Sequence, residues 1–205
     1  ANLSQQLEGM ASAIQSVATV APELSAPEVR SSTSRRLRTL SEAMPGVRTM
    51  QLTNASGRVL ASNRPEVVGF DASQRAYFLA AKDKTDGDAL YVSEPFKTIL
   101  GAYSLNLVKT WVNAQGQFGG VVTATLDPEY IHVLLNSVLY AQDMRATLVH
   151  GDGRAFLTTP KNSAVLGAQL AVPGTNFSSH MASGRAESVT SGWVPLTGED
   201  RLIAF

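Results

Sequence analysis

The segment from Asp71 to Phe78 combines one cation with two aromatic rings at the start of a predicted helix. Asp71 is a residue type that caps helices, and Gln74, three positions later, can bond back to the cap. Arg75 follows where unpaired backbone N–H groups point. A guanidinium and a helix start both favour a carboxylate or another anion, and the rings of Tyr77 and Phe78 would enclose its apolar part. The same residues also fit an Asp71–Arg75 ion pair with both rings in the core.

Further candidate contacts lie on strands predicted after this helix. Tyr91 and Ser93 could offer hydroxyl groups to a ligand, and Lys109 could bind a second carboxylate. Alternation along the strand 103–112 places Lys109 on one face and Asn106 on the other, so periodicity does not decide which face lines a pocket. The hydroxyls fit ordinary core and edge positions equally well, and a lysine at a strand end is usually solvated.

Composition argues against several other functions. The 17 basic and 17 acidic residues of the 205-residue chain cancel, so nucleic acid is not expected as a partner. The chain has no cysteine, which excludes disulfides and thiol catalysis. Its three histidines fall on a helix, a turn and a weak helix, and the sequence has no recognisable hydrolase or nucleotide-binding motif. We therefore expect no metal, no cofactor and no enzymatic activity in this chain. No apolar run of about 18 residues occurs.

The first 45 residues predict a long, broken helical region. Apolar residues recur at alternating steps of four and three from Leu3 to Ala21, which is the stripe of an amphipathic helix. Pro22 and Pro27 interrupt this pattern, and a second one covers residues 37–44. Such helices either cover a sheet or form a dimer stalk that carries a signal towards a membrane. We expect both roles, with covering the sheet as the main one.

Beyond residue 45 the periodicity changes to that of strands. The predicted strands cover residues 47–52, 58–62, 90–96, 103–112 and 118–126, with a helix over 71–81 between the second and third. Glycine-containing turns at 54–57 and 113–116 join two of the strand pairs. Two strands, one helix and three strands are the order of a PAS-like module, which has an α+β fold.

The second half of the chain repeats the first at an almost constant offset. Gly57-Arg58 returns 96 residues later as Gly153-Arg154, and Val68-Gly69 returns 98 residues later as Leu166-Gly167. The repeat ends at Phe205 before its last strand, so we expect an incomplete second module and a natural chain that continues. The predicted domains are a helical region 1–45, a ligand-binding PAS-like module 46–127, a linking helix 128–142 and a truncated PAS-like module 143–205.

Several short motifs follow one another in a specific order. They are Asp71-Ala72-Ser73-Gln74-Arg75-Ala76-Tyr77-Phe78, Tyr91-Val92-Ser93-Glu94-Pro95, Ser104-Leu105, Gly116-Gln117-Phe118-Gly119-Gly120-Val121-Val122 and Leu126-Asp127-Pro128-Glu129-Tyr130. This order and spacing resemble the double Cache sensor family. In that family a long N-terminal helix precedes two stacked PAS-like modules, which lie outside the cytoplasm between two transmembrane helices of a bacterial signalling protein. The resemblance covers nearly all of the chain and is strongest over residues 69–130.

The resemblance also implies where a ligand binds. Family ligands generally occupy the module farther from the membrane, with the arginine and aromatic helix as one wall, so Arg75, Tyr77 and Phe78 carry over as candidates. Amino-acid-binding members usually have a tryptophan near the position of Tyr77 and an acidic residue on the last strand, which holds the ammonium. This chain has Thr125 on that strand and Asp127 two places later, where a cap for the linking helix is expected. The resemblance therefore favours a small carboxylate without an amine.

Together these inferences predict a periplasmic sensor domain that binds a small organic acid or a related metabolite. The predicted ligand-binding residues are Arg75, Tyr77, Phe78, Tyr91, Ser93, Lys109 and Thr125. The motifs look most like those of sensors attached to diguanylate cyclase or histidine kinase outputs, with flanking transmembrane helices and a homodimer formed through the N-terminal helix. The alternative is a ligand-free dimerisation or interaction domain with a filled core. A hydrolase that acts outside the cell is disfavoured by the missing motifs.

Overall fold

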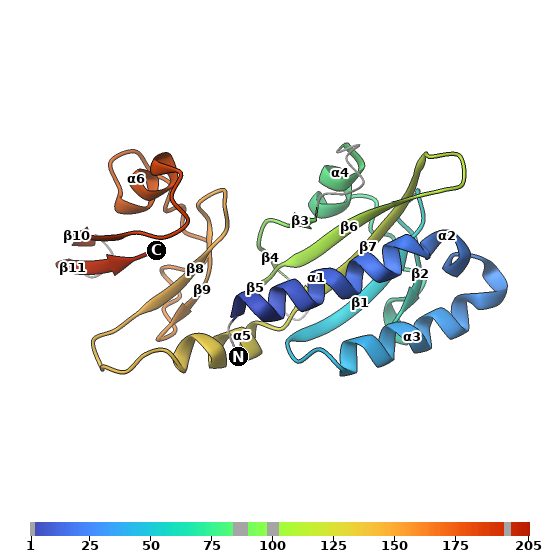
Figure 1. The fold of residues 1–205 in the computed structure, drawn as a ribbon, viewed down its shortest axis with the longest axis horizontal. Helices are drawn as coiled ribbons and strands as arrows, with labels where there is room; N and C mark the ends of the chain where they lie inside the picture. Colours follow the sequence, from blue (N-terminus) through green and yellow to red (C-terminus); the bar gives the residue numbers. More distant parts are fainter. Residues whose placement is uncertain (1–2, 84–89, 98–102, 195–197) are drawn as a thin grey trace. The chain divides into compact units, whose positions relative to one another are not determined.

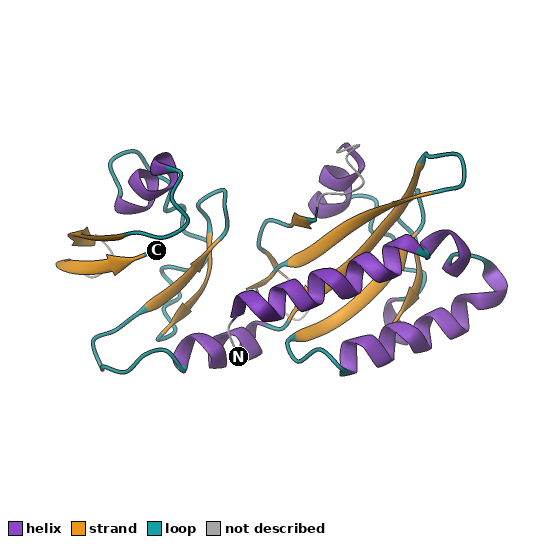
Figure 2. Cartoon of the chain, in the orientation of Figure 1, coloured by secondary structure: helices purple, strands orange, loops and turns teal. Residues whose placement is uncertain are grey.

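The computed structural model describes residues 3–83, 90–97, 103–194 and 198–205. Contacts within the chain separate two compact units, residues 1–134 (unit 1) and 135–205 (unit 2). Both units contain helices and antiparallel strands (Figure 2). The predicted α+β fold with an N-terminal helix and antiparallel sheets is thus confirmed.

Unit 1 begins with helices that lie on one side of its sheet (Figure 1). Their bounds are α1 Leu3–Thr19, α2 Ala21–Leu24, the 3-10 turn η1 Pro27–Val29 and α3 Arg30–Glu42. The apolar stripe explains this position, because Ile14 and Val17 of α1 and Leu37 of α3 are fully buried. The apolar pattern covers residues 37–44, but helix α3 already begins at Arg30. In this first part of the helix Thr33 is buried, and its hydroxyl donates to the Val29 carbonyl oxygen at 2.9 Å. Within the described residues, no helix is long and apolar enough to cross a bilayer.

The main sheet of unit 1 has five antiparallel strands in the order β2-β1-β7-β6-β3. Their bounds are β1 Val47–Thr53, β2 Val59–Ser62, β3 Tyr91–Val92, β6 Asn106–Val112 and β7 Phe118–Leu126, while β4 Phe96–Lys97 pairs separately with β5 Tyr103–Ser104. The predicted strand 90–96 is therefore only partly formed. Its ladder ends at Ser93, because the Ser93 hydroxyl oxygen, rather than a backbone carbonyl, accepts the amide of Asn106 at 2.8 Å.

Helix α4 starts later than predicted. The expected helix covered 71–81, whereas α4 is Ala76–Asp83. Asp71 caps a local turn, in which its carboxylate accepts the amide of Ser73 at 2.8 Å. Arg75 instead precedes the helix, and its carbonyl oxygen accepts the amide of the residue four positions ahead at 3.0 Å. The segment before Arg75 still pairs with the end of the first hairpin, which delays the helix start.

Helix α5, which contains the boundary between the units, and the elements of unit 2 follow β7. Their bounds are α5 Pro128–Asn136, β8 Ala146–Val149, β9 Ala155–Thr159, α6 Asn176–Ser183, β10 Val189–Val194 and β11 Glu199–Ala204. Asp127 caps α5, as expected, because its carboxylate accepts the amide of Glu129 at 3.0 Å. Strands β8 and β9 form one hairpin of unit 2, and β10 and β11 form another.

The internal repeat is visible in the backbone hydrogen bonds. In unit 1 the amide of Gly69 donates to the carbonyl oxygen of Val59 at 2.8 Å. In unit 2 the amide of Gly167 donates to the carbonyl oxygen of Ala155 at 2.7 Å. Both glycines have a positive φ, 87° and 80°. Each hairpin is therefore followed by the same glycine-containing loop, which folds back onto its second strand.

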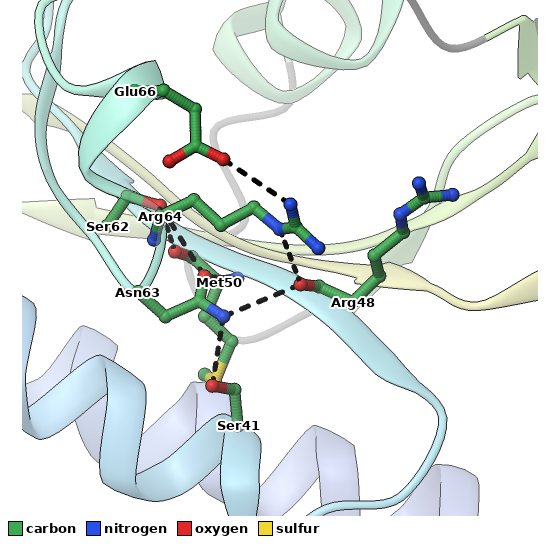
Figure 3. A network of polar contacts seen from close by, with 7 residues as sticks. All are labelled: Ser41, Arg48, Met50, Ser62, Asn63, Arg64 and Glu66. Carbon is green, nitrogen blue, oxygen red and sulfur yellow. Dashed lines mark hydrogen bonds and ion pairs between the residues drawn. The ribbon is translucent and has the colours of Figure 1, made fainter. Parts of the chain in front are cut away.

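A polar network joins α3 to the first hairpin (Figure 3). The side chain of Asn63 is its centre. Asn63 Oδ1 accepts the backbone amide of Met50 at 2.8 Å, and Asn63 Nδ2 donates to the Ser41 hydroxyl at 3.0 Å. Arg64 donates from Nε to the Arg48 carbonyl at 3.2 Å. These bonds satisfy backbone groups at the sheet edge and hold the end of α3 on the sheet.

Candidate functional site

Helix α4 packs against one face of the unit 1 sheet. Tyr77, Phe78 and Ala81 form a buried cluster with Val108 of β6 and Val121 of β7. Because side chains alternate along a strand, the neighbours of these two valines point to the other face of the sheet. The face that contacts α4 is therefore distinct from the one that carries Met50, Leu107 and Val122.

Buried, uncharged polar side chains gather on this α4 side. Gln51 of β1 lies opposite Thr123 of β7, which in turn lies opposite Val108 of β6, and Thr125 lies opposite Asn106. The exposed fractions of Gln51, Asn106 and Thr123 are 8, 2 and 0 %. We call Gln51, Asn106, Thr123 and Thr125 the polar floor. Polar side chains at this depth are normally hydrogen-bonded, so each partner matters.

Most of the polar floor is paired, but one hydroxyl is not. Gln51 Nε2 donates to the Tyr77 hydroxyl at 3.1 Å, and Thr125 Oγ1 donates to Asn106 Oδ1 at 2.7 Å. Thr123 Oγ1 is buried and has no hydrogen-bond partner within the described part of the chain. A buried hydroxyl without a partner costs roughly 1–3 kcal/mol. Thr123 thus has an unused hydrogen-bonding group beneath α4.

Tyr77 connects α4 to the polar floor. Burial raises the pKa of its phenol, while the hydrogen bond from Gln51 and the charge of Arg75 act in the opposite direction. The phenol therefore stays neutral at physiological pH. Because its oxygen accepts from Gln51, its proton remains available to donate to a ligand oxygen. The ring of Phe96 lies 6.2 Å from that of Tyr77.

Arg75 lies at the start of α4 and is half-buried. Its guanidinium carbon is 5.4 Å from the centre of the Phe70 ring, a cation–π distance. Asp71 is engaged by Ser73 instead of pairing with Arg75, and within the described ranges no other carboxylate forms an ion pair with this guanidinium. The charge of Arg75 is close enough to Tyr77 to affect its pKa, so the two groups share one region.

The other predicted site residues divide between the two sides of the sheet. Tyr91 lies opposite Val108 and packs on the α4 cluster. The Ser93 hydroxyl is occupied by the backbone, since it also donates to the Glu94 carbonyl at 3.0 Å. Phe78 is 1 % exposed and packs edge-on against Phe118. Phe78 therefore occupies a core position.

Lys109 is buried, at 3 % exposure, on β6 next to Val108. Strand alternation places its side chain on the face of the sheet opposite α4. The geometry therefore brings Arg75, Tyr77, Tyr91 and Thr125 to one side and leaves Lys109 outside that group.

Sequence reasoning missed three residues of this region. Gln51, Asn106 and Thr123 do not belong to any recognised motif. A signal was nevertheless present, because polar residues occupy every second position of otherwise apolar strands at Thr49 and Gln51, and again at Thr123 and Thr125. Such alternation on a buried strand marks a polar patch inside the protein.

Comparison with known proteins adds a fold assignment. No family model and no curated protein sequence matches this chain. The extracellular domain of the candidate histidine kinase rpHK1S-Z16 superposes with a TM-score of 0.83 at 19 % identity, over 98 % of this chain and 80 % of that one. The chain has the fold of an extracellular sensor domain of double Cache type.

Two chemoreceptor domains share this sensor fold. The ligand-binding domain of Pseudomonas fluorescens CtaA, in complex with L-serine, matches with a TM-score of 0.66 at 18 % identity, over 98 % of this chain and 82 % of that one. The ligand-binding domain of the Pseudomonas aeruginosa PAO1 amino acid chemoreceptor PctC, in complex with GABA, matches with a TM-score of 0.65 at 23 % identity, over 92 % and 80 %. The double Cache resemblance inferred from the motifs is thus confirmed at the level of the fold.

Proposed function

We propose that this chain is the extracytoplasmic sensor domain of a membrane signalling protein and binds a small carboxylate between α4 and the sheet of unit 1. The observation that carries the proposal is the buried, unpartnered hydroxyl of Thr123 beneath α4. Arg75 supplies a positive charge at the start of that helix, and the Tyr77 hydroxyl, which accepts from Gln51, supplies a hydrogen-bond donor. The sensor fold of the matched domains supports the same reading.

The chemistry of the polar floor favours a carboxylate without an amine. The ligands named for CtaA and PctC, L-serine and GABA, carry both an ammonium and a carboxylate. Within the described residues, the floor beneath α4 consists of hydroxyl and carboxamide groups, and Asp127 is used to cap α5. An ammonium would find no carboxylate on this floor, which makes its burial costly. Arg75 can pair with a carboxylate, and Thr123 and Tyr77 can bond to further oxygens.

The proposal also covers how a bound ligand would be signalled to the cytoplasm. In this proposal the two units are two PAS-like modules. They lie in the periplasm, flanked by transmembrane helices, and signal to a cytoplasmic diguanylate cyclase or histidine kinase. Ligand binding would favour one of two arrangements of the sheet against the N-terminal helices, which also form a homodimer.

The test compares organic acids with their amino analogues in thermal denaturation. Propionate with alanine and succinate with aspartate are suitable pairs, because the members of each pair differ only by the amine. A ligand at about 100 times its Kd should stabilise the domain by about 2.7 kcal/mol and raise its Tm. We expect an acid to produce this shift, its amino analogue to produce a smaller one, and Arg75→Ala to abolish it.

Arg36→Ala is the matched control, because Arg36 is exposed on α3 and should leave the shift unchanged. An undiminished shift in Arg75→Ala would contradict the assignment of the guanidinium. A larger shift with alanine or aspartate than with the deaminated partner would contradict the ligand class.

A ligand-free interaction domain is the second candidate function. It is favoured by the close packing of Phe78 and Phe118, whose rings lie 5.7 Å apart and fill part of the space under α4. This reading expects no ligand to shift the Tm, and it expects self-association that depends on α1. Sedimentation analysis of the unaltered chain and of Ser12→Arg, which adds a charge at an exposed position of α1, separates the two candidates.

A further inference from the structure

A cleft of about 310 Å³ opens in unit 1 between the start of α3 and β2. Its walls come from elements that contribute nothing to the polar floor or to α4. Pockets that hold small ligands have volumes from about 300 Å³ upward, so the cleft can hold a compact metabolite. Two arginines, Arg30 of α3 and Arg58 before β2, contribute to its lining.

Both guanidinium groups keep unused donors. Arg58 donates from Nη1 to the Gly69 carbonyl at 3.1 Å, and Arg30 donates from Nε to the Ser25 carbonyl at 3.5 Å. Neither forms an ion pair with a carboxylate among the described residues. Since a guanidinium has five N–H donors, each arginine can still bind an anion.

The acidic groups nearby are already engaged. Asp71 lies across a backbone bridge from Arg58, and its pKa is lowered chiefly by the hydrogen bond from the Ser73 amide and only to a smaller degree by Arg58. Glu66 pairs with Arg64 at 3.3 Å. Both carboxylates therefore have other partners, and neither forms an ion pair with Arg30 or Arg58.

The remaining lining is apolar or carries hydroxyls. Val59 and Leu60 are buried, and Val68, 45 % exposed, also lines the cleft. From α3 come Ser31 and Ser34, of which Ser34 Oγ accepts the amide of Ser62 at 3.3 Å and keeps its own proton to donate. A ligand that fits this lining has anionic ends and a short apolar body.

We propose that this cleft is a second small-molecule site, which binds a short-chain dicarboxylate through Arg30 and Arg58. The two arginines supply charge-assisted hydrogen bonds to the carboxylates, and Val59, Leu60 and Val68 contact the methylene chain. Because the cleft joins α3 to β2, an occupied site would hold the N-terminal helices on the sheet independently of the carboxylate site under α4.

The test is a titration of the whole chain followed by ¹H–¹⁵N NMR. The probes are glutarate, inorganic phosphate, which has the charge without the apolar body, and 1,5-pentanediol, which has the body without the charge. We expect glutarate to shift the amides of Ser31, Ser34 and Gly69, phosphate to do so with a higher Kd, and pentanediol to leave them unchanged.

Variants assign the binding to the two guanidinium groups. Arg30→Ala and Arg58→Ala should each raise the Kd for glutarate roughly tenfold or more, which is the usual effect of losing a charged hydrogen bond. Ser31→Glu, at an exposed helix position, should abolish binding by repulsion without a loss of packing. The matched control is Arg36→Ala on the same helix, which should bind glutarate as the unaltered chain does.

Absence of shifts at these amides, unchanged Kd values in both arginine variants, or equal Kd values for glutarate and phosphate would each overturn the proposal. Arg75→Ala distinguishes this site from the one under α4. If the cleft is real, glutarate still shifts Ser31 and Gly69 in Arg75→Ala, whatever happens to the Tm shift of the proposed function.

Discussion

At the residue scale, two threonines on neighbouring strands are equally buried but differ in the hydrogen bonding of their hydroxyl groups. Thr53 and Thr123 are both fully buried. Thr53 Oγ1 accepts the amide of Val121 at 3.0 Å and donates to the carbonyl of the same residue at 3.4 Å. Thr123 Oγ1 has no such partner in the described residues. One hydroxyl therefore stabilises the fold, and the other is the group to which the proposed ligand would bond.

We expect Thr123→Val to raise the free energy of unfolding of the unliganded chain by about 1 kcal/mol, because it removes an unsatisfied buried hydroxyl. It should also reduce the Tm shift produced by the bound acid. Thr53→Val is the control and should lower the free energy of unfolding by about 1–2 kcal/mol. Urea denaturation measures both, and a loss of stability in Thr123→Val equal to that in Thr53→Val would contradict this role.

Tyr77 gives the stability of unit 1 a dependence on alkaline pH. Its pKa is raised from the ordinary value of 10.0 by burial, so the folded chain holds the proton more tightly than the unfolded chain. Its contribution is complete below the unfolded pKa and is lost as pH rises through the folded pKa. We expect Tyr77→Phe to lose less stability than the unaltered chain between about pH 9 and about pH 11. Denaturation at both pH values measures this, and equal losses would disprove it.

At the element scale, α3 is attached to the sheet by side chains that bond to backbone. Asn63 bonds at once to the backbone of Met50 and to Ser41 of α3, as Figure 3 shows. The ion pair between Arg64 and Glu66, in the same view, is exposed to solvent. Bonds to buried backbone groups are worth more than exposed ion pairs, so the two parts of the network should respond differently to substitution.

We expect Asn63→Ala to lower the free energy of unfolding by about 2 kcal/mol, because the amide of Met50 and the hydroxyl of Ser41 lose their partner. Glu66→Gln should change it by less than about 0.5 kcal/mol, since an exposed ion pair contributes little. Urea denaturation of both variants measures the difference. Equal effects would show that the network does not anchor the helix.

At the scale of the whole molecule, the two units differ in the size of their cores. Most buried apolar side chains that the structure describes belong to unit 1. Those in the described part of unit 2 are Ala155, Phe156, Leu157 and Val165. Because apolar burial is the main stabilising contribution to folding, unit 2 should be the less stable of the two.

Calorimetry should therefore show two unfolding transitions, with unit 2 unfolding first. Phe156→Ala should lower only the first Tm, and Leu37→Ala only the second, each by removing about 3–4 kcal/mol of core packing. A ligand bound under α4 should raise the second Tm alone. A single transition that both variants lower equally would show that the units unfold together.

Periodicity predicted the elements with strong patterns and failed where tertiary contacts compete with local signals. The strand 118–126 has its predicted bounds because its apolar residues are buried on both faces. The start of α4 was wrong by five residues, because Asp71 has a capping residue type but is held in a turn beside Arg58. Arg75 and Tyr77 were singled out because they belong to a motif, whereas Thr123 was not, because its unpaired hydroxyl is visible only in the tertiary structure.

The sequence by itself determined the order of elements, the internal repeat and the resemblance to an extracytoplasmic sensor, since these follow from spacing along the chain. Only the tertiary structure decided which strand face lies under α4, because alternation defines two faces without saying what covers each. That choice leaves Lys109 on the far side and brings Gln51, Asn106 and Thr123 beneath the helix. The packing of α3 on β2, likewise visible only in the tertiary structure, places Arg30 and Arg58, 28 positions apart in the chain, in one cleft.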